Sequence, residues 1–354
     1  MLDPREYCFW CMNKLASANG VCPVCGKDNR SRKNGEGELP FSLVARKYIV
    51  GHALGRGGFG ITYIGLNMML SKRVAIKEYF PQDISRRSAD GINVQASSPE
   101  TAGQFEEGKR KALEEARIIA RVQNVSNVVG VYDCFSRNNT VYIIMEYLEG
   151  ETFASRVGRK GPRKWKEIWP ELRPVGVALG QLHRLKLIHR DISPDNIMIR
   201  NDTGENILLD FGAASGIVAK GQTRASVLKD GYAATEMYQE QAEINGRADE
   251  YAWSATLWYI LTGQRPPSAQ QRRMQNSEMK APSGIRRKMP EAVWKALRKG
   301  MALRPEDRYP AMEDMIRDLD RAGTGSSGST AVLVAAAAVA FAVLVVSVIA
   351  GVFL

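Results

Sequence analysis

One stretch of this chain restricts its fold more than any other: residues 189–196, with the sequence HRDISPDN, followed fourteen residues later by Asp210. Asp191 in this stretch is a candidate proton acceptor, and Asn196 and Asp210 offer the oxygen ligands that Mg²⁺ and Mn²⁺ prefer. A proton acceptor and two cation ligands at this spacing are what phosphoryl transfer needs. The fold must therefore bring side chains from two separate segments to one site.

Two further motifs lie upstream of this stretch. Gly55, Gly57 and Gly60 form the pattern Gly-x-Gly-x-x-Gly, and Lys77 ends the apolar run Val-Ala-Ile-Lys at residues 74–77. Glycines let a hairpin backbone approach phosphate oxygens that a Cβ would push away, although a hairpin with incidental glycines would show the same pattern. A lysine at the end of an apolar strand needs partners for its charge. The glycine pattern is weak evidence alone, but the ordered set of motifs is specific.

In this order and spacing, the motifs resemble those of bacterial, eukaryotic-like Ser/Thr protein kinases that are anchored in the membrane. The resemblance covers roughly residues 41 to 321. It implies an α+β, bilobal protein kinase fold with a strand-rich front and a helix-rich back. It also implies ATP and Mg²⁺ or Mn²⁺ as cofactors, and phosphorylation of Ser and Thr hydroxyls on proteins, including this one.

The resemblance assigns roles within the catalytic loop. It implies that Asp191 accepts the proton of the substrate hydroxyl, and that Asn196 and Asp210 hold the metal ions that bridge the phosphates. It also implies that His189 is a structural residue, so we assign it no part in the chemistry.

Lys77 is implied to contact the α- and β-phosphates and to pair with a Glu on the next helix. Glu115 fits the local pattern of that helix best, and Glu107 and Glu114 are alternatives. The distance in sequence from Lys77 to Glu115 is long for this family, which implies an insertion. We expect that insertion, residues 78–104, to be irregular, because it contains two prolines, several serines and two glycines.

Adenine recognition is implied for the segment around Met145, which fits the position at the back of the nucleotide pocket. A methionine on an apolar strand is equally well explained as core, and both readings can hold together. Thr62 stands where the family often has Val, but its methyl group can still pack on the adenine ring. The implied nucleotide contacts are Gly55, Gly57, Gly60, Thr62, Ala75, Lys77, Met145, Glu146, Tyr147 and Leu148.

Three features separate a protein kinase from small-molecule phosphotransferases that share the core motifs. Residues 231–236 (GYAATE) resemble the end of an activation segment, although Ala-Thr replaces the usual Pro-containing pair. Asp249 is implied to brace the backbone of the catalytic loop, and Arg308 is implied to form a buried ion pair with Glu236. The candidate phosphorylation sites in the activation segment are Thr223 and Ser226, with Ser215 less favoured.

Two departures from the family concern the charge at the transferring phosphate. The second residue after the catalytic Asp is usually a Lys in Ser/Thr kinases, but here it is Ser193. The position three residues before Tyr232, usually a Thr beside the catalytic Asp, is Lys229. We therefore expect the Lys229 ammonium to replace the missing lysine; the alternative is a solvated lysine in a loop.

The first 25 residues carry two Cys-x₂-Cys pairs, formed by Cys8 and Cys11 and by Cys22 and Cys25. Four soft ligands in two such knuckles predict a tetrahedral, structural Zn²⁺ site, with an iron centre of the rubredoxin type as the alternative. We expect residues 1–39 to form a small zinc ribbon followed by a polar, glycine-rich linker at residues 28–38. Such ribbons bind nucleic acid or protein, and the sequence does not decide between these uses.

The C-terminal end predicts a membrane anchor. Residues 322–330 (AGTGSSGST) have the composition of a flexible linker, and residues 331–354 are 24 consecutive residues without charge. A helix of that length reaches about 36 Å, enough for a hydrocarbon core of about 30 Å. Arg317 and Arg321 precede this span, which places the kinase-like body, residues 40–321, on the cytoplasmic side of the bacterial inner membrane. The alanine-rich stretch at 335–338 would let two such helices approach closely and dimerise, although no Gly-x-x-x-Gly motif accompanies it.

The formal net charge of +11 is concentrated in the kinase-like body. It is densest between Arg265 and Arg304, where eleven basic residues face only Glu278 and Glu291. This run is either a solvated face or a surface for anionic lipid headgroups or acidic partners. No recognition motif accompanies it, so nucleic acid is not an expected partner.

Our interpretation is a membrane-tethered Ser/Thr protein kinase with an N-terminal zinc ribbon. The main alternative is a pseudokinase scaffold that binds nucleotide but transfers phosphate poorly, which the presence of Lys77, Asp191, Asn196 and Asp210 argues against. A zinc-ribbon nucleic-acid binder with a kinase-like regulatory body is a third hypothesis that rests on charge and the ribbon alone. Helices are expected at 104–122, 175–187, 248–261, 293–301 and 312–319, and strands at 47–50, 73–77, 128–135 and 141–147.

Overall fold

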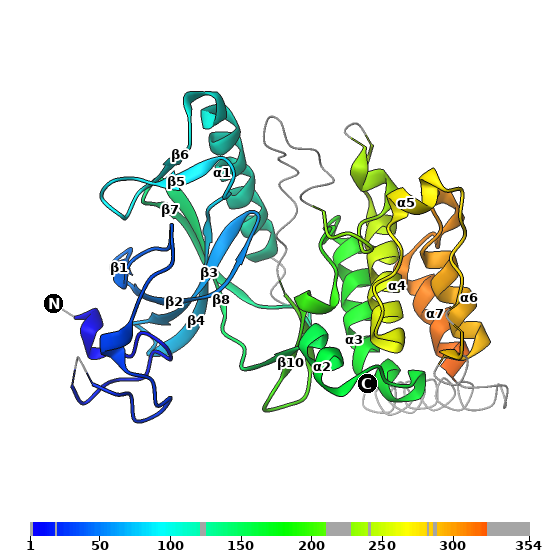
Figure 1. The fold of residues 1–354 in the computed structure, drawn as a ribbon, viewed down its shortest axis with the longest axis horizontal. Helices are drawn as coiled ribbons and strands as arrows, with labels where there is room; N and C mark the ends of the chain where they lie inside the picture. The colour runs from blue at the N-terminus through cyan, green and yellow to red at the C-terminus, as the bar shows by residue number, and fades with distance from the viewer. Residues whose placement is uncertain are drawn as a thin grey trace, which may run out of the picture.

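The structure, a computed structural model, describes residues 3–17, 20–120, 125–209, 228–239, 242–281, 283–285 and 289–323, apart from the side chains of Glu115 and Ile119. These residues form a lobe built on a β-sheet and a lobe of helices, side by side (Figure 1). The expected α+β, bilobal arrangement is confirmed.

The sheet lobe contains one six-stranded antiparallel sheet in the order β1-β2-β3-β4-β8-β7. Its strands are β1 (Ser42–Val44), β2 (Tyr48–Gly57), β3 (Gly60–Asn67), β4 (Lys72–Tyr79), β7 (Val131–Arg137) and β8 (Thr140–Glu146). Successive side chains of a strand point to opposite faces, so Val74 and Ile76 enter one hydrophobic cluster and Ala75 another. The same alternation separates Lys77 from its neighbour Glu78, which is fully buried.

The insertion at residues 78–104 is more regular than expected. It contains the antiparallel hairpin β5 (Ser85–Arg87) and β6 (Val94–Ala96), and α1 (Pro99–Ala120) begins five residues earlier than the apolar spacing suggested. Strands of three residues are too short to show a period-two pattern in the sequence. Hydrogen bonds hold the hairpin to the β7–β8 turn: Val94 N donates to Asn138 O at 2.9 Å, and Asn139 Nδ2 donates to Val94 O at 2.8 Å.

A smaller sheet joins the two lobes. Its three strands, in the order β11-β10-β9, are β9 (Gly150–Thr152), β10 (Ile197–Arg200) and β11 (Asn206–Leu208). Helix α2 (Phe153–Lys160) follows β9 directly, because the hydroxyl of Thr152 caps its first turn by accepting from Ser155 N. The catalytic loop lies just before β10, so the small sheet positions it.

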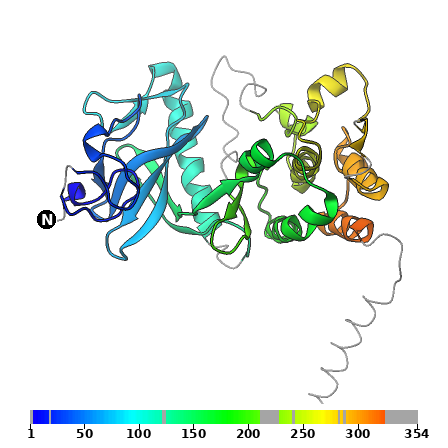
Figure 2. The same ribbon diagram turned by 60° about the horizontal axis from the view of Figure 1, so that its bottom comes forward.

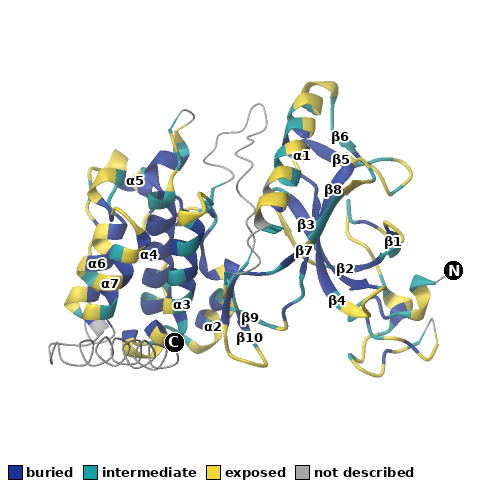
Figure 3. Ribbon diagram, turned by 180° about the vertical axis from the view of Figure 1, so that it is seen from behind, coloured by how far each residue is buried: buried dark blue, intermediate teal, exposed yellow. Residues whose placement is uncertain are grey.

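The helical lobe is organised around α4 (Gly246–Thr262), which is buried along nearly its whole length (Figure 3). A helix that is buried on all sides must be surrounded by other elements. Its neighbours are α2, α3 (Trp165–Arg184), α6 (Glu291–Gly300) and α7 (Met312–Gly323), and α5 (Ala269–Met274) lies near residues 235–238. Short 3₁₀ helices are η1 (Pro4–Glu6), η2 (Asn29–Ser31), η3 (Pro194–Asn196), η5 (Thr235–Tyr238) and η7 (Pro305–Asp307).

Residues 3–17 and 20–39, here called the N-terminal segment, pack against the sheet lobe. Two isolated β-bridges, Tyr7 with Lys14 and Val21 with Asp28, each close a loop that carries one cysteine pair. The polar stretch at 28–38, which we expected to be a linker, is part of this packing, and Leu39 after it is fully buried. Its polar groups bond to side chains far away in the sequence, which composition does not reveal.

The C-terminal part of the chain is described only as far as residue 323. Helix α7 continues through Gly323, so the first two residues of the expected linker at 322–330 are helical. Among the described residues, no helix combines the length and the apolar character that crossing a bilayer requires. The expected span at 331–354 lies outside the described residues.

Candidate active site

A cleft with a volume of about 1130 Å³ lies between the two lobes. Residues of both lobes line it, together with residues 147–149, here called the joining segment, which connect β8 to β9. Figure 2 shows the two lobes on either side of this connection. Of the residues expected to bind nucleotide or to take part in the chemistry, those that line this cleft are Gly55, Gly57, Gly60, Thr62, Ala75, Lys77, Met145, Glu146, Tyr147, Leu148, Asp191, Asn196 and Lys229. The structure therefore brings together residues that lie up to 174 positions apart in the sequence.

The glycine-rich loop is the hairpin between β2 and β3. A Cβ on Gly60 would lie 2.3 Å from the carbonyl oxygen of Glu78, so this glycine is needed by the protein's own packing. A Cβ on Gly55 or Gly57 would meet nothing within 4 Å. The open space beside these two glycines leaves room for close approach of a ligand.

The inner wall of the cleft is the central strand pair. Ala75 on β4 stands opposite Met145 on β8, and Lys77 stands opposite Thr62 on β3. Met145 is 7 % exposed and belongs to a buried cluster, yet it also lines the cleft. It is thus core and pocket wall at once. Glu146, at the end of β8, forms an ion pair of 2.5 Å with Arg200 on β10, which ties the joining segment to the small sheet.

Helix α1 carries the three glutamates proposed as partners of Lys77. Glu107 and Glu114 both pair with Arg110, at 2.7 Å and 2.6 Å, on the surface of the helix. The carboxylates of Glu107 and Glu114 are therefore paired with Arg110 at the helix surface. Glu115, the preferred candidate, is a residue of α1, but its side chain lies outside the described part of the structure.

In the catalytic loop, Asn196 holds Asp191. The Asn196 amide nitrogen donates to the backbone oxygen of Asp191 at 2.6 Å and to its carboxylate Oδ2 at 2.9 Å. His189 is fully buried, and its Nε2 lies 2.8 Å from the carbonyl oxygen of Leu209. These bonds fix the carboxylate in the cleft and connect the loop to the residue that precedes Asp210. Asp210 itself lies outside the described residues, as do the candidate phosphorylation sites Ser215, Thr223 and Ser226.

Asp249, near the start of α4, holds the backbone of the catalytic loop, residues 189–196. Its two carboxylate oxygens accept the backbone N–H groups of His189 and Arg190, each at 2.8 Å. His183 Nε2 lies 2.8 Å from the same carboxylate. Burial opposes the ionisation of Asp249, but the bond with His183 and the His189 N–H outweigh it, so the pKa of Asp249 lies below its ordinary value. The sequence had indicated Asp249, whereas the role of His183 was missed.

The end of the activation segment is held by a buried ion pair. Arg308 donates two parallel hydrogen bonds to Glu236, of 2.7 Å and 2.9 Å, and the two side chains are 0 % and 8 % exposed. Such two-point pairing of a guanidinium with a carboxylate is specific as well as strong. The structure thus contains the pair that the sequence predicted.

Lys229 lies beside Asp191, the candidate proton acceptor. Its ammonium nitrogen is 3.2 Å from Asp191 Oδ1 and donates to the hydroxyl of Ser193 at 2.9 Å. The two departures noted in the sequence are therefore in contact with each other and with the proton acceptor. Their spatial relation is the one that we expected.

The four cysteines of the N-terminal segment form a compact cluster. Their sulfur atoms all lie within 4.8 Å of one another, and the pairs Cys8–Cys25 and Cys11–Cys22 are 3.7 Å apart. A tetrahedral site with zinc–sulfur bonds of about 2.3 Å has sulfur–sulfur edges of about 3.8 Å, so this arrangement fits the metal. Asn13 Nδ2 donates to Cys11 Sγ at 3.2 Å, as an outer partner of a metal ligand does.

A two-lobed body whose cleft holds a glycine-rich hairpin, a strand lysine and a braced Asp–Asn pair has the architecture of a protein kinase domain. The chain belongs to the protein kinase domain family, which it matches over residues 48–318.

Curated relatives agree with this placement. Serine/threonine-protein kinase PrkC of Bacillus subtilis is 27% identical over 285 residues, which cover 79% of this chain and 41% of PrkC. Serine/threonine-protein kinase PknL of Mycobacterium tuberculosis is 29% identical over 230 residues, or 64% of this chain and 52% of PknL. Tyrosine-protein kinase MasK of Myxococcus xanthus is 34% identical over 222 residues, or 56% of this chain and 33% of MasK. The chain spans about half the length of these relatives, or less.

A solved structure described as the apo form of PpkA-294 has the same fold. It superposes with a TM-score of 0.69 at 28% identity, over 80% of this chain and 99% of that one.

Proposed function

We propose that the chain is an ATP-dependent protein kinase that phosphorylates Ser and Thr hydroxyls on proteins, including itself. The observation that carries this proposal is the geometry of the catalytic loop, where Asn196 holds the Asp191 carboxylate in the cleft while Asp249 fixes the loop backbone. A proton acceptor held this firmly needs no reorganisation when a substrate hydroxyl arrives.

The chain's own residues suffice for the remaining roles. Asn196 uses its amide nitrogen on Asp191, which leaves its Oδ1 as a hard oxygen donor. This donor and Asp210 fit Mg²⁺ or Mn²⁺, and the cation, when bound, neutralises charge on the phosphates. The glycine-rich loop covers the phosphates, and Lys77 orients them from β4.

The assignment is tested by incubating the full chain with labelled ATP and Mg²⁺. Asp191→Asn removes the proton acceptor and should abolish transfer to itself and to a generic basic protein. Asp202→Asn, an exposed acid in the β10–β11 turn, is the matched control and should leave the rate unchanged. Acid hydrolysis of the product should give phosphoserine and phosphothreonine. Phosphotyrosine alone would contradict the Ser/Thr assignment, and equal rates for wild type and Asp191→Asn would contradict the kinase assignment.

The same assay separates the kinase from the pseudokinase scaffold. A scaffold would bind a labelled nucleotide as the wild type does but would show no transfer above the Asp191→Asn level. We favour the kinase because Lys77, Asp191 and Asn196 all line the cleft.

We also propose a structural Zn²⁺ at Cys8, Cys11, Cys22 and Cys25, supported by the fit of the sulfur–sulfur distances to a tetrahedral site. Elemental analysis should find about one zinc per chain, lost in Cys22→Ser and retained in Cys134→Ser, which changes the cysteine outside the cluster. Iron in place of zinc would establish the rubredoxin alternative.

A membrane location is supported by composition alone. Residues 331–354 are proposed to anchor the chain in the bacterial inner membrane with the kinase body in the cytoplasm. The basic run from Arg265 to Arg304 is proposed to face anionic headgroups. Arg272 does not contribute, because it is buried and donates to the Met301 carbonyl oxygen at 2.9 Å.

A further inference from the structure

Lys229 is held where a transferring phosphate group would pass. Its ammonium contacts the Asp191 carboxylate and the Ser193 hydroxyl, and its carbonyl oxygen accepts from the backbone N–H groups of Tyr232 and Ala233 at 3.0 Å and 3.1 Å. Tyr232 and Ala233 are both buried in the core of the helical lobe. The lysine therefore projects from an anchored backbone, which argues against a solvated lysine in a loose loop.

Position 193 carries no charge here. Ser193 is 0 % exposed, and its hydroxyl is a neutral group that accepts the hydrogen bond from Lys229. Phosphoryl transfer spreads negative charge over the three oxygens of the moving group, and preorganised positive donors stabilise that charge.

We propose that Lys229 is a catalytic residue that neutralises the transferring phosphoryl group, a role that rests on the proposed kinase function. The substrate hydroxyl oxygen forms a bond to the γ-phosphorus of ATP, and the bond from that phosphorus to the β–γ bridging oxygen breaks. ADP leaves with the electron pair, and the hydroxyl proton goes to Asp191. Lys229 keeps its protons and donates hydrogen bonds to oxygens of the moving group.

A different role for the same contact is inhibition, in which Lys229 only neutralises Asp191. The two roles predict opposite results, because loss of an inhibitory lysine raises the rate, whereas loss of a catalytic one lowers it.

The test compares single-turnover rates and nucleotide dissociation constants for full-length variants. Lys229→Ala should lower the rate about 10²-fold, the usual effect of removing one transition-state donor, with nucleotide affinity within about twofold. Adding Ser193→Lys to that variant should restore at least about tenfold. Lys166→Ala, on the exposed face of α3, is the control and should match the wild type.

Three results would overturn this role: a Lys229→Ala rate within twofold of wild type, a higher rate, or a loss that Ser193→Lys does not rescue. The Asp191→Asn variant gives the background. If wild type exceeds that background but Lys229→Ala equals wild type, the kinase function stands and only the role of Lys229 falls.

A second inference rests on independent contacts, those of the N-terminal segment with the nucleotide site. The first contact is at the glycine-rich loop. Arg56 in that loop donates to the carbonyl oxygen of Glu36 at 2.5 Å and lies 3.5 Å from the carboxylate of Glu38. The N-terminal segment therefore holds the outer edge of the hairpin that would cover the phosphates.

The second contact reaches the adenine end of the cleft. Met12, at the tip of the first cysteine loop, is buried against Ile49 and Ile64 of the sheet, and Tyr147 packs on the same cluster. Phe9 O accepts from His52 N on β2 at 3.1 Å, so the cysteine loop is also bonded to the sheet backbone. Tyr147 thus lines the cleft on one side and touches the cluster that holds the cysteine loop on the other.

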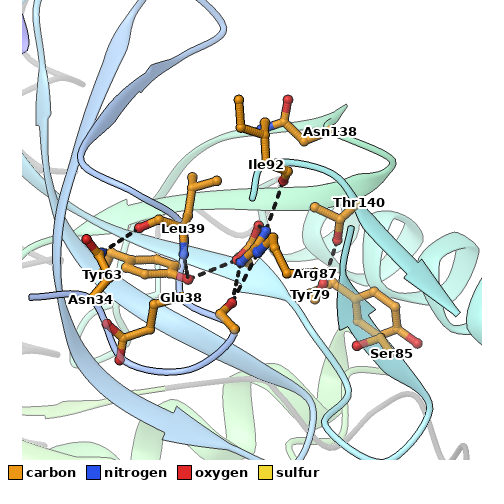
Figure 4. A network of polar contacts seen from close by, with 12 residues as sticks. Asn34, Glu38, Leu39, Tyr63, Tyr79, Ser85, Arg87, Ile92, Asn138 and Thr140 are labelled. Carbon is orange, nitrogen blue, oxygen red and sulfur yellow. Dashed lines mark hydrogen bonds and ion pairs between the residues drawn. The ribbon is translucent and has the colours of Figure 1, made fainter. Parts of the chain in front are cut away.

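The third contact is behind Lys77. Glu78 is fully buried and accepts two hydrogen bonds from Arg87, at 2.7 Å and 2.6 Å, and one from Tyr63 at 3.0 Å. Arg87 also donates to the Gly37 carbonyl oxygen at 2.7 Å, and Tyr63 accepts from Leu39 N at 2.9 Å. Figure 4 shows the side chains of Arg87 and Tyr63 close together, with the backbone of Leu39 beside the Tyr63 hydroxyl. The strand that carries Lys77 is thereby bonded to the N-terminal segment.

The geometry points to an intramolecular clamp: the N-terminal segment positions the glycine-rich loop, the joining segment and β4, and the metal at its four cysteines keeps it docked. So short a segment has little core of its own, so metal binding supplies the energy that orders it. Removing the metal should therefore weaken nucleotide binding without touching the cleft. This clamp rests on the proposed nucleotide binding but not on phosphoryl transfer.

The test uses the full chain and three variants. Cys22→Ser removes a metal ligand, Met12→Asp breaks the docking with all four cysteines intact, and Val24→Asp is the control, since Val24 is 66% exposed on the second cysteine loop. We expect ADP affinity, measured by calorimetry, to fall about tenfold in Cys22→Ser and in Met12→Asp and to stay unchanged in Val24→Asp. Met12→Asp should keep its metal.

Hydrogen exchange provides the second readout. Amides of β2 and β3 should lose protection in Cys22→Ser and Met12→Asp, while those of α4 keep theirs, which shows that the helical lobe is folded. Wild-type ADP affinity in either variant would overturn the clamp, as would unchanged protection of β2 and β3. If wild type binds no nucleotide at all, the proposed function fails as well.

Discussion

Substitution of Arg87 by Ala would leave the fully buried carboxylate of Glu78 without its cation. The Glu78 side chain is 0% exposed and that of Arg87 is 8% exposed, so solvent does little to screen the pair. Breaking a buried ion pair by removing one partner costs about 3–5 kcal/mol. The hydroxyls of Tyr63 and Tyr142 still donate to Glu78 in the variant, at 3.0 Å and 2.8 Å, so we expect the lower end, about 3 kcal/mol.

The assay is denaturant unfolding of the full chain, followed by hydrogen exchange of β3 and β4 so that the sheet lobe is observed separately. Arg86→Ala is the matched control, because Arg86 is the exposed neighbour on the same strand. Adding Glu78→Gln to Arg87→Ala should recover about 1–2 kcal/mol, since a neutral amide needs no cation. A loss for Arg87→Ala within about 1 kcal/mol of that for Arg86→Ala would refute this reasoning.

Three other predictions concern the helical lobe. Burial raises the pKa of Glu250 to about 8, from 4.5 for an ordinary glutamate. Wild type should therefore lose stability relative to Glu250→Gln as the pH rises from about 4.5 to about 8. If the difference between their thermal unfolding temperatures is the same at pH 5 and at pH 8, this prediction is wrong. Arg308→Ala should cost about 3–5 kcal/mol in unfolding experiments, and Arg308→Lys should not restore it, because one ammonium cannot make both bonds to Glu236. If the basic run at 265–304 meets lipid, residues 1–323 should bind vesicles containing anionic lipid and be released by salt, whereas equal binding to neutral vesicles would exclude charge as the cause.

Motifs with fixed partners could be predicted from the sequence. Asp249 was placed beneath the catalytic loop, and Arg308 was paired with Glu236, although the members of that pair are 72 positions apart. Each of these residues occupies a characteristic position relative to a recognisable motif. The cluster of four cysteines could be predicted equally well, because its members lie within 18 residues.

Contacts that depend on the packing of distant segments could not be predicted. The sequence shows Glu78 only as a charge beside Lys77, and its burial arises because Arg87 and Tyr63 cover that face of β4. The stretch at 28–38 looked like a linker because its composition is polar, yet Gly37 uses its backbone oxygen to accept from Arg87. Backbone acceptors carry no signature in a sequence, so this docking was invisible before the structure.

Gly51 on β2 is a position where the residue type depends on whether the N-terminal segment is docked on the sheet. A Cβ at this position would lie 2.1 Å from the terminal methyl group of Met12 and 2.5 Å from the carbonyl oxygen of Phe9. No larger residue could therefore occupy this position while the first cysteine loop stays in place. In other kinases that carry two Cys-x₂-Cys pairs before the sheet lobe, we therefore expect a glycine here wherever the cysteine loops rest on the sheet as they do in this chain. A bulky residue at the same position should exclude this docking.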